Sequence, residues 1–297
     1  MENVLSTQQL SKHYGSLKAV HNLELNIPKG SVFGILGPNG SGKTTTLGML
    51  LDVIQPTSGS YKWFGENGTK EQRKKIGAIL ETPIFYPYLS AYKNLKIIAL
   101  IKEVPEERIS EVLTQVGLAQ RQNDAFRTYS LGMKQRLSIA SALLCNPEVM
   151  ILDEPTNGLD PQGIADIRAL IIDIAQHGKT IILASHLLDE VQKVCTDFAV
   201  LKNGNLIYTG KVDDVSKGES KVILKANGDI ETILANCPLV AQSELGINGQ
   251  FEIIMAEGKT ADDLSAYLFD QKIMVTHLET QTKTLEKQFL ELLNNAK

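Results

Sequence analysis

The segment that most constrains this sequence is rich in glycine and reads Gly37-Pro38-Asn39-Gly40-Ser41-Gly42-Lys43-Thr44-Thr45. It fits the pattern G-x-x-x-x-G-K-[ST] at every position. The apolar run Ser31–Leu36 precedes it and a helical pattern over Thr44–Leu51 follows, so the segment is predicted to join a strand to a helix. Glycines in such a turn let backbone amides point inward around an anion, because no Cβ stands in the way. The chain is therefore predicted to be an α/β protein that binds phosphate groups on this loop.

The residues of this phosphate loop have separate expected roles. Lys43 supplies a positive charge to the β- and γ-phosphates of a nucleotide, and the Thr44 hydroxyl is a candidate ligand of Mg²⁺. The other predicted nucleotide contacts are Gly37, Asn39, Gly40, Ser41, Gly42 and Thr45. The helix that begins near Thr44 directs the positive end of its dipole at the phosphates. The competing interpretation, a glycine-rich turn with a chance lysine, is disfavoured by the strand and helix on either side.

Two carboxylates follow a second apolar run, Val149–Leu152. A run of this kind is typical of a buried parallel strand, so Asp153 is predicted at the carboxyl end of a strand, where α/β sheets bind ligands. Asp153 can hold Mg²⁺, mostly through water. Glu154 comes next and is predicted to polarise an attacking water. Alone, an Asp-Glu pair after a strand is usually a solvated strand end. Together with the phosphate loop, the pair predicts hydrolysis of ATP.

Composition excludes several other classes of protein. An apolar share of 43% is enough for ordinary cores, and a net charge of −4 gives no electrostatic case for nucleic-acid binding. The three cysteines, Cys145, Cys195 and Cys237, lie far apart and fit buried thiols in a reduced, cytoplasmic chain. No run approaches the ~18–20 apolar residues of a membrane-spanning helix, and the N-terminus lacks the pattern of a signal peptide. Any membrane attachment is therefore expected to come through a partner.

The pattern of apolar residues divides the chain into two predicted domains. Residues 1–215 alternate β-branched runs with helical patterns, as an α/β domain does, and the stretch between Pro83 and Ser141 is mostly helical. Its clearest helices are Ala91–Ile101 and Glu106–Val116. Apolar runs lapse near Asp213–Glu219, which places the boundary there and leaves residues 216–297 as a second domain.

The second domain is predicted to be a small α+β fold. Its expected elements are strand 221–226, helix 230–236, strand 240–246, strand 250–256, helix 261–270 and strand 273–279. Asn248-Gly249 lies between the middle two strands and favours a hairpin turn. This order matches a split β-α-β, ferredoxin-like unit. A last helix is predicted over Leu285–Leu293.

A third motif narrows the class of nucleotide-binding protein. The segment Ser130-Leu131-Gly132-Met133-Lys134-Gln135-Arg136, placed before Asp153-Glu154, resembles the signature motif of the ABC (ATP-binding cassette) ATPases. Leu131 and Met133 replace the commoner glycine and glutamine. The resemblance covers residues 1–215. It implies a P-loop NTPase fold of the cassette type, with a RecA-like core and a helical subdomain at about residues 83–141. It also makes Ser130 and Gly132 nucleotide contacts at a helix start.

Other residues occupy positions that the resemblance makes functional. Tyr14 matches the aromatic that stacks on adenine, and His186 matches the switch histidine that touches the γ-phosphate. Gly158-Leu159-Asp160 resembles the dimer-contact loop that follows the catalytic carboxylate. The alternatives are an exposed aromatic near a strand end for Tyr14 and a polar surface residue for His186.

In this family the signature motif of one cassette closes over the nucleotide held by another. The resemblance therefore implies a second ATP-binding subunit, in the simplest case a homodimer. Each ATP would lie between Lys43, Asp153 and Glu154 of one chain and Ser130 and Gly132 of the other. It also implies an ATP-hydrolysing motor subunit that drives a separate transmembrane permease. Such a subunit would be peripheral on the inner face of the cell membrane.

One position departs from the family pattern. Where the family usually has a glutamine that binds Mg²⁺, this chain has Glu81, which is therefore a candidate metal ligand with an added negative charge. Glu81 and the following run Ile84–Leu89 resemble the subgroup involved in bacitracin resistance and lantibiotic self-immunity. That subgroup implies an exporter of peptide antibiotics or related compounds. The aromatic run Phe85–Tyr88 is either a docking surface for the permease or ordinary core packing.

Two other functions remain open at this level. A soluble ABC ATPase that acts on ribosomes or DNA is the first, although such members resemble paired cassettes or carry a long coiled-coil insert, and this chain has neither. A regulatory nucleotide-binding module without useful hydrolysis is the second, and Glu154 and His186 argue against it.

Overall fold

The computed structural model describes residues 2–67, 69–80, 85–216, 221–228, 230–246 and 249–281. Within these residues the chain forms two compact units, an N-terminal unit up to Val212 and a C-terminal unit from Asp213. The predicted boundary after residue 215 falls inside the short helix α8 (Val212–Ser216). Glu81 and the predicted helix Leu285–Leu293 lie outside the described residues.

The N-terminal unit is built around a mostly parallel sheet of six strands in the order β11-β10-β4-β9-β8-β7. Its strands are β4 (Val32–Leu36), β7 (Ile76–Ile79), β8 (Val149–Asp153), β9 (Thr180–Ser185), β10 (Asp197–Lys202) and β11 (Asn205–Lys211). Only β11 runs antiparallel to its neighbour. Every residue of β4, β8 and β9 is buried, which explains why these strands read as continuous apolar runs. Because β4, β9 and β8 are parallel neighbours, their carboxyl ends meet at one edge.

A second, antiparallel sheet covers the helix that follows the phosphate loop. Its strands are β1 (Asn3–Tyr14), β2 (Leu17–Leu23), β3 (Asn26–Pro28), β5 (Ser58–Trp63) and β6 (Glu66–Asn67). Helix α1 (Lys43–Leu50) shares one core with both sheets, to which it contributes Leu47, Met49 and Leu50. The indole Nε1 of Trp63 donates to Leu50 O at 2.8 Å. This bond ties the C-terminal end of α1, the end away from the phosphate loop, to β5.

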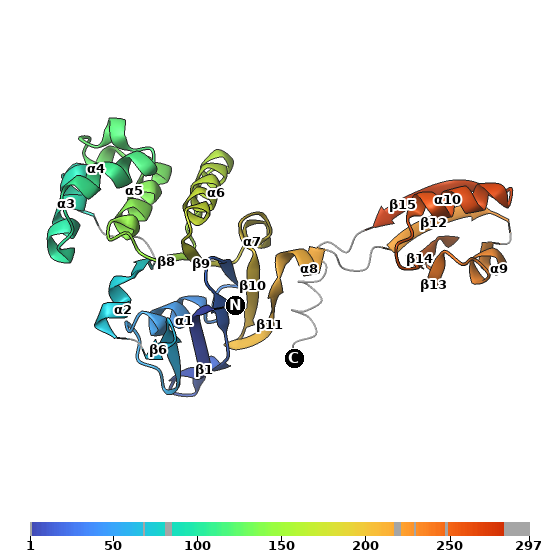
Figure 1. Cartoon of the computed structure of the whole chain (residues 1–297), viewed down its shortest axis with the longest axis horizontal. Helices are drawn as coiled ribbons and strands as arrows, with labels where there is room; N and C mark the ends of the chain where they lie inside the picture. Colours follow the sequence, from blue (N-terminus) through green and yellow to red (C-terminus); the bar gives the residue numbers. More distant parts are fainter. Residues whose placement is uncertain are drawn as a thin grey trace. The chain divides into compact units, whose positions relative to one another are not determined.

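The predicted helical subdomain forms a separate group of helices in the N-terminal unit (Figure 1). It contains α3 (Ala91–Lys102), α4 (Glu107–Gln115) and α5 (Leu131–Leu143), with 3₁₀ turns η1 (Ala119–Arg121) and η2 (Phe126–Thr128). Helix α4 buries Ile109, Val112 and Leu113, the spacing of one helix face. The other helices of the unit are α2 (Lys70–Lys74), α6 (Pro161–Gln176) and α7 (Leu188–Val194).

The aromatic run before α3 is only partly exposed. It is therefore neither wholly a docking surface nor wholly core packing. Phe85 is only 7% exposed, and its ring packs against that of Phe126 with centroids 5.0 Å apart. Tyr86 and Tyr88 are 50% and 70% exposed, with ring centroids 6.0 Å apart. The run therefore divides into one core residue and two surface tyrosines, because a turn can direct successive side chains to opposite sides.

The C-terminal unit has the element order β-α-β-β-α-β. Its elements are β12 (Lys221–Asn227), α9 (Ile230–Ala235), β13 (Val240–Leu245), β14 (Phe251–Met255), α10 (Ala261–Asp270) and β15 (Met274–Gln281). The strand order is β13-β14-β12-β15, and all pairs are antiparallel. Strands β12 and β13 therefore run parallel with β14 between them, which is the arrangement of a split β-α-β unit. Its core includes Val222, Leu224, Ile253, Leu264 and Leu268.

The chain's apolar helices and its cysteines bear on membrane insertion and on disulfide bonding. In the described ranges, no helix has the length and apolarity required to cross a membrane. The cysteines are free, and Cys195 and Cys237 are buried as expected. Cys145 is only half-buried, because it lies beyond the end of α5.

Candidate functional site

The phosphate loop joins β4 to α1 and is closely surrounded by backbone. A Cβ on Gly37 would lie 2.4 Å from the carbonyl oxygen of Leu201, and a Cβ on Gly42 would lie 2.5 Å from that of Ala19. Gly42 also has a φ of 104°, a conformation that side-chain-bearing residues rarely adopt. The two glycines are thus required by sterics as well as by the turn. Strands β10 and β2 hold the loop from two sides.

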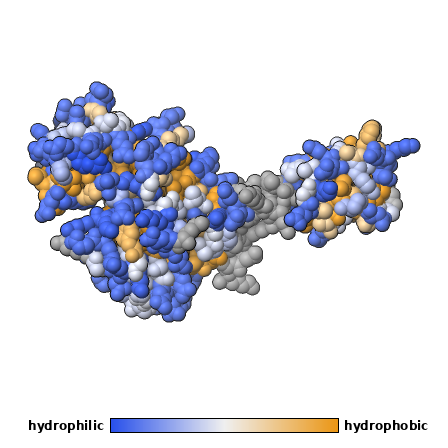
Figure 2. All heavy atoms as spheres, in the orientation of Figure 1, coloured by the Kyte–Doolittle hydropathy of each residue, from blue (hydrophilic) through white to orange (hydrophobic). Residues whose placement is uncertain are grey.

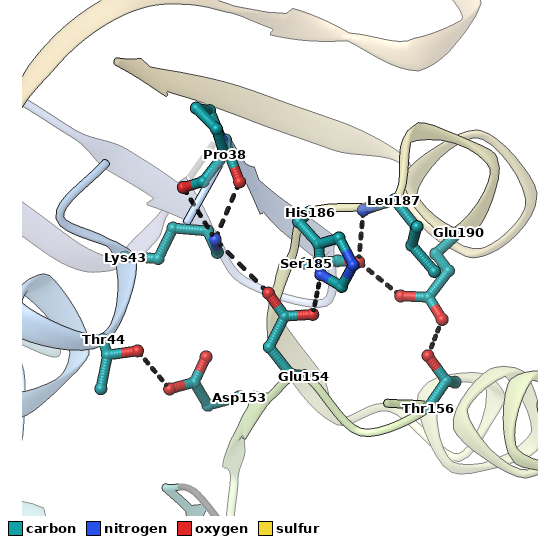
Figure 3. A network of polar contacts seen from close by, with 11 residues as sticks. Pro38, Lys43, Thr44, Asp153, Glu154, Thr156, Ser185, His186, Leu187 and Glu190 are labelled. Carbon is teal, nitrogen blue, oxygen red and sulfur yellow. Dashed lines mark hydrogen bonds and ion pairs between the residues drawn. The ribbon is translucent and has the colours of Figure 1, made fainter. Parts of the chain in front are cut away.

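The charged residue of the loop is almost fully enclosed. Lys43 is 6% exposed, and its Nζ donates to Gly37 O at 2.8 Å and to Pro38 O at 3.3 Å. The same ammonium lies 3.4 Å from Glu154 Oε1 (Figure 3). Burial of a charge is costly unless the charge is paired and hydrogen-bonded, and these oxygens supply the pairing. The positive charge is thereby fixed at the mouth of the loop.

The remaining loop residues differ in exposure. Ser41 is buried and its hydroxyl has no hydrogen-bond partner among the described residues. Asn39, Gly40 and Thr44 are exposed, and Thr45 is partly buried. A buried hydroxyl without a partner inside a loop that encloses an anion site is a donor available to a ligand.

Thr44 and Asp153 meet across the gap between α1 and β8. Thr44 Oγ1 donates to Asp153 Oδ2 at 2.7 Å, and Asp153 is 6% exposed. A hydroxyl and a carboxylate at this separation are the oxygen donors that Mg²⁺ takes from proteins, with phosphates and water completing its shell. The described residues contain no cluster of three or more His, Cys, Asp or Glu suited to a metal. Thr44 and Asp153 fit Mg²⁺ because they offer the hard oxygen ligands that this ion prefers.

Glu154 and His186 meet at the ends of neighbouring strands β8 and β9. His186 Nδ1 lies 2.7 Å from Glu154 Oε2, so the carboxylate of Glu154 contacts Lys43 with one oxygen and His186 with the other. The Glu154 N–H donates to Ala184 O at 2.9 Å, which joins the two strand ends. Glu154 is 22% and His186 35% exposed, so both side chains are accessible from solvent. A carboxylate oriented by a histidine beside a phosphate site can polarise water.

A buried group next to this pair was not predicted. Glu190 of α7 is 1% exposed and accepts hydrogen bonds from the hydroxyls of Ser185 and Thr156 (Figure 3). Burial raises the pKa of the Glu190 carboxyl, and the hydrogen bond from Ser185 opposes that shift. Glu190 lies in a short, mostly polar helical segment, so the sequence pattern predicts that its carboxylate is exposed at the surface. Only its position between two strand ends reveals the contact.

Tyr14 is the last residue of β1 and is 51% exposed. It pairs with Leu17 in the hairpin of β1 and β2, the same hairpin whose Ala19 carbonyl approaches Gly42. The ammonium of Lys12 lies 5.0 Å from the centre of the Tyr14 ring. The hairpin therefore connects an exposed aromatic ring to the phosphate loop, and stacking of adenine on that ring stays a prediction.

The signature residues begin α5, outside the group formed by the phosphate loop and the strand ends. Ser130 is exposed and caps α5 by accepting from Met133 N at 3.3 Å. A Cβ on Gly132 would meet nothing within 4 Å, so the surface there is open. Figure 1 shows α5 among the helices of the helical group and α1 in the sheet-containing part. The chain thus brings together Lys43, Asp153, Glu154 and His186. Ser130 and Gly132 lie elsewhere, at an open surface at the start of α5.

Comparison with known proteins agrees with this geometry. The family model described as "ABC transporter" matches residues 20–157. An ABC transporter ATP-binding protein of Bacillus subtilis, YhcH, is 38% identical over 305 residues, which cover 100% of this chain and 98% of the relative. The bacitracin transport ATP-binding protein BcrA of Bacillus licheniformis is 44% identical over 228 residues (75% and 74%). The lantibiotic transport ATP-binding protein SrtF of Streptococcus pyogenes is 40% identical over 210 residues (71% and 92%).

A solved structure extends the likeness to three dimensions. It is the dimeric structure of a post-hydrolysis state of an ATP-binding cassette bound to ADP and Pi, with 26% identity and a TM-score of 0.61, covering 70% of this chain and 98% of that one. The fold and site therefore define an ABC-type ATPase. The chain belongs to the ATP-binding subunits of ABC transporters, and it is the ATP-hydrolysing motor subunit of such a transporter. The predicted family and its bacitracin and lantibiotic branch are confirmed.

Proposed function

We propose that two copies of this chain bind two Mg-ATP molecules between them and drive the export of peptide antibiotics or related compounds through a separate permease. The observation that carries the proposal is a half-built site. Lys43, Asp153 and Glu154 converge at one edge of the parallel sheet, whereas Ser130 is exposed at the start of α5 and the surface over Gly132 is open. A second copy would supply the missing half.

The residues of each half have distinct tasks in this proposal. Lys43 and the loop amides hold the phosphates, and Asp153 with Thr44 holds Mg²⁺. Bound Mg²⁺ supplies charge neutralisation on the phosphate oxygens. Glu154 accepts a hydrogen bond from the attacking water and so orients it, and His186 keeps the Glu154 carboxylate in place. We assign Glu81 to the metal site on the sequence pattern alone.

The helical group offers a surface for the permease. Leu100 and Ile101 at the end of α3 are 71% and 77% exposed, and Figure 2 shows apolar surface at the edge of this group. A cavity of about 790 Å³ lies beside them, lined by Ile101, Val104, Pro105 and Leu144 and by the charged Arg73 and Arg108. Exposed apolar residues beside a cavity are typical of a protein interface. Docking there would hold the chain at the inner face of the cell membrane.

The substrate class rests on the relatives. The relatives are named for bacitracin transport and for lantibiotic transport, and they share 44% and 40% identity with this chain. In transporters of this kind the cargo is bound by the membrane subunit, so the ATP-binding chain specifies the energy source.

Antibiotic sensitivity tests the proposal directly. Expression of the chain with the membrane protein that co-purifies with it should raise the resistance of a sensitive bacterium to bacitracin or a lantibiotic, and Lys43→Ala should remove the effect. Purified chain should form dimers with ATP when hydrolysis is blocked by Glu154→Gln. Resistance that is equal with Lys43→Ala, or co-purification with ribosomes or DNA and no membrane protein, would contradict the proposal.

A further inference from the structure

Behind the two catalytic candidates lies a carboxylate that neither the sequence motifs nor the family comparison uses. Glu190 on α7 is 1% exposed, and carboxylates are seldom so deeply buried unless they are paired. Its Oε2 accepts from the Ser185 hydroxyl and its Oε1 from the Thr156 hydroxyl. Figure 3 shows the three side chains in a row beside Glu154 and His186.

The two hydroxyls belong to the two segments that carry the catalytic candidates. Thr156 is in the turn Glu154-Pro155-Thr156 after β8, and Ser185 immediately precedes His186 at the end of β9. Thr156 precedes Glu190 by 34 residues along the chain and Ser185 precedes it by 5. A single carboxylate therefore joins the backbone that presents Glu154 to the backbone that presents His186.

Local contacts constrain both segments. The Ser185 hydroxyl that donates to Glu190 also accepts from Leu187 N at 3.0 Å, so it fixes the chain on both sides of His186. Glu154 has a φ of 48°, the left-handed region that non-glycine residues seldom adopt and that neighbouring contacts must hold. The backbone of these two segments therefore sets the directions of the Glu154 and His186 side chains.

We propose that Glu190 is a positioning residue for ATP hydrolysis, whose bridge between Thr156 and Ser185 holds His186 Nδ1 and Glu154 Oε2 at their 2.7 Å contact. The inference rests on the catalytic roles of Glu154 and His186 proposed above. Glu190 itself touches neither the nucleotide site nor the reacting atoms. It acts by fixing the distance and angle at which Glu154 meets water.

The chemistry of the bridge requires a carboxylate. An ionised carboxylate only accepts hydrogen bonds, so both hydroxyls must donate to it and the lone pairs of Ser185 stay available to the Leu187 amide. Glutamine would offer one acceptor and one donor, and leucine would offer neither. The charge of Arg168, which lies near Glu190, favours the ionised form against the cost of burial. The hydrogen-bonded bridge from residue 190 to Thr156 and Ser185 should therefore be weaker in Glu190→Gln and absent in Glu190→Leu.

The test compares steady-state ATP hydrolysis by the full chain and by variants at this position. Glu190→Leu should lower kcat by about 10- to 100-fold while the KM for ATP changes by less than about twofold, since displacement of a reacting group by about 1 Å costs rate and leaves binding intact. Glu190→Gln should lose less, and it preserves the test if Glu190→Leu does not fold. Gln192→Ala is the matched control on the same helix. Gln192 is exposed on α7 and leaves Arg168 and its ion pair unchanged, so its variant should stay within about twofold of wild type.

A double-mutant cycle separates positioning from general stabilisation. Ser185→Ala and Glu190→Leu break the same bridge, so the combined variant should lose no more activity than the worse single variant. Losses that multiply, a wild-type kcat in Glu190→Leu, or a raised KM with unchanged kcat would each overturn the inference. His186→Ala, measured alongside, identifies which proposal fails. If it turns over ATP at the wild-type rate, the role of His186 is wrong and this inference falls with it. If it is inactive while the Glu190 variants are normal, only this inference is wrong.

Discussion

Glycines of the phosphate loop allow the steric argument to be tested by two matched substitutions. Gly40 and Gly42 both have positive φ, 79° and 104°. A Cβ on Gly40 would meet nothing within 4 Å, whereas one on Gly42 would lie 2.5 Å from the carbonyl oxygen of Ala19. Gly40→Ala therefore adds only the cost of a left-handed alanine, and Gly42→Ala adds that cost and a collision with backbone.

The expected magnitudes follow from this difference. A left-handed conformation costs an alanine about 1–2 kcal/mol, which is the predicted loss in free energy of unfolding for Gly40→Ala. In Gly42→Ala the new methyl must also move away from a backbone oxygen of β2 by roughly 1 Å to reach an ordinary contact. A displacement of this size at a reacting group can lower the rate by about 100-fold. We expect kcat/KM for ATP to fall by about that factor in Gly42→Ala and by less than about tenfold in Gly40→Ala.

The assay measures urea unfolding and ATP hydrolysis of the two full-length variants and the wild type at the same protein concentration. Unfolding reports the strain common to both variants, and hydrolysis reports the displacement of the loop. Equal losses of kcat/KM in the two variants would show that contact with Ala19 does not shape the loop. That result would refute the reasoning.

Four further predictions follow from the site. Glu154→Gln should leave ATP binding intact and lower kcat by about 100-fold or more, and wild-type hydrolysis would remove Glu154 from the water-orienting role. Trp63→Phe should lower the free energy of unfolding by about 1–3 kcal/mol in urea titrations, because it leaves the buried Leu50 carbonyl without its indole donor; an unchanged midpoint would contradict this. Glu81→Gln should make ATP affinity less dependent on Mg²⁺ if, as the family pattern implies, Glu81 adds its negative charge at the metal site, and equal metal dependence would rule out that effect. Burial raises the pKa of the Glu190 carboxyl above its usual value of 4.5, so the folded state binds this proton more tightly than the unfolded state does. The resulting contribution to the free energy of unfolding is fully present below pH 4.5 and is lost as the pH rises through the pKa of the folded state. Glu190→Gln should flatten that decline in thermal unfolding curves, and identical pH profiles would contradict it.

The parallel sheet shows why much of the site could be predicted. Asp153, Glu154 and His186 each follow an apolar run, and such runs become buried parallel strands. Since β8 and β9 are neighbours, residues just past their carboxyl ends must lie close together. The pairing of Glu154 with His186 is a consequence of that register, although their chemical roles stay predictions.

Other features could not be read from local patterns. Phe85 and Tyr86 are adjacent aromatic residues, but Phe85 is buried and Tyr86 is exposed. Phe126, which is distant along the chain, packs against the ring of Phe85. Glu190 reads as a surface carboxylate until β8 and β9 place Thr156 and Ser185 against it. The signal available in the sequence was a hydroxyl shortly after β8 and another in the last residue of β9, and hydroxyls at strand ends are too common to identify a contact.

The sequence by itself determined the phosphate loop, the order of the helices and strands, and the ends of the strands that carry the site. Those features depend on neighbouring residues, through backbone conformation and the period of apolar side chains. Tertiary structure decided which aromatic is buried, how the charge of Lys43 is enclosed, and that Ser130 lies at a surface apart from the chain's own loop. These three features depend on contacts between residues that are distant along the chain. No local sequence pattern encodes them, because burial and enclosure are set by packing against other elements.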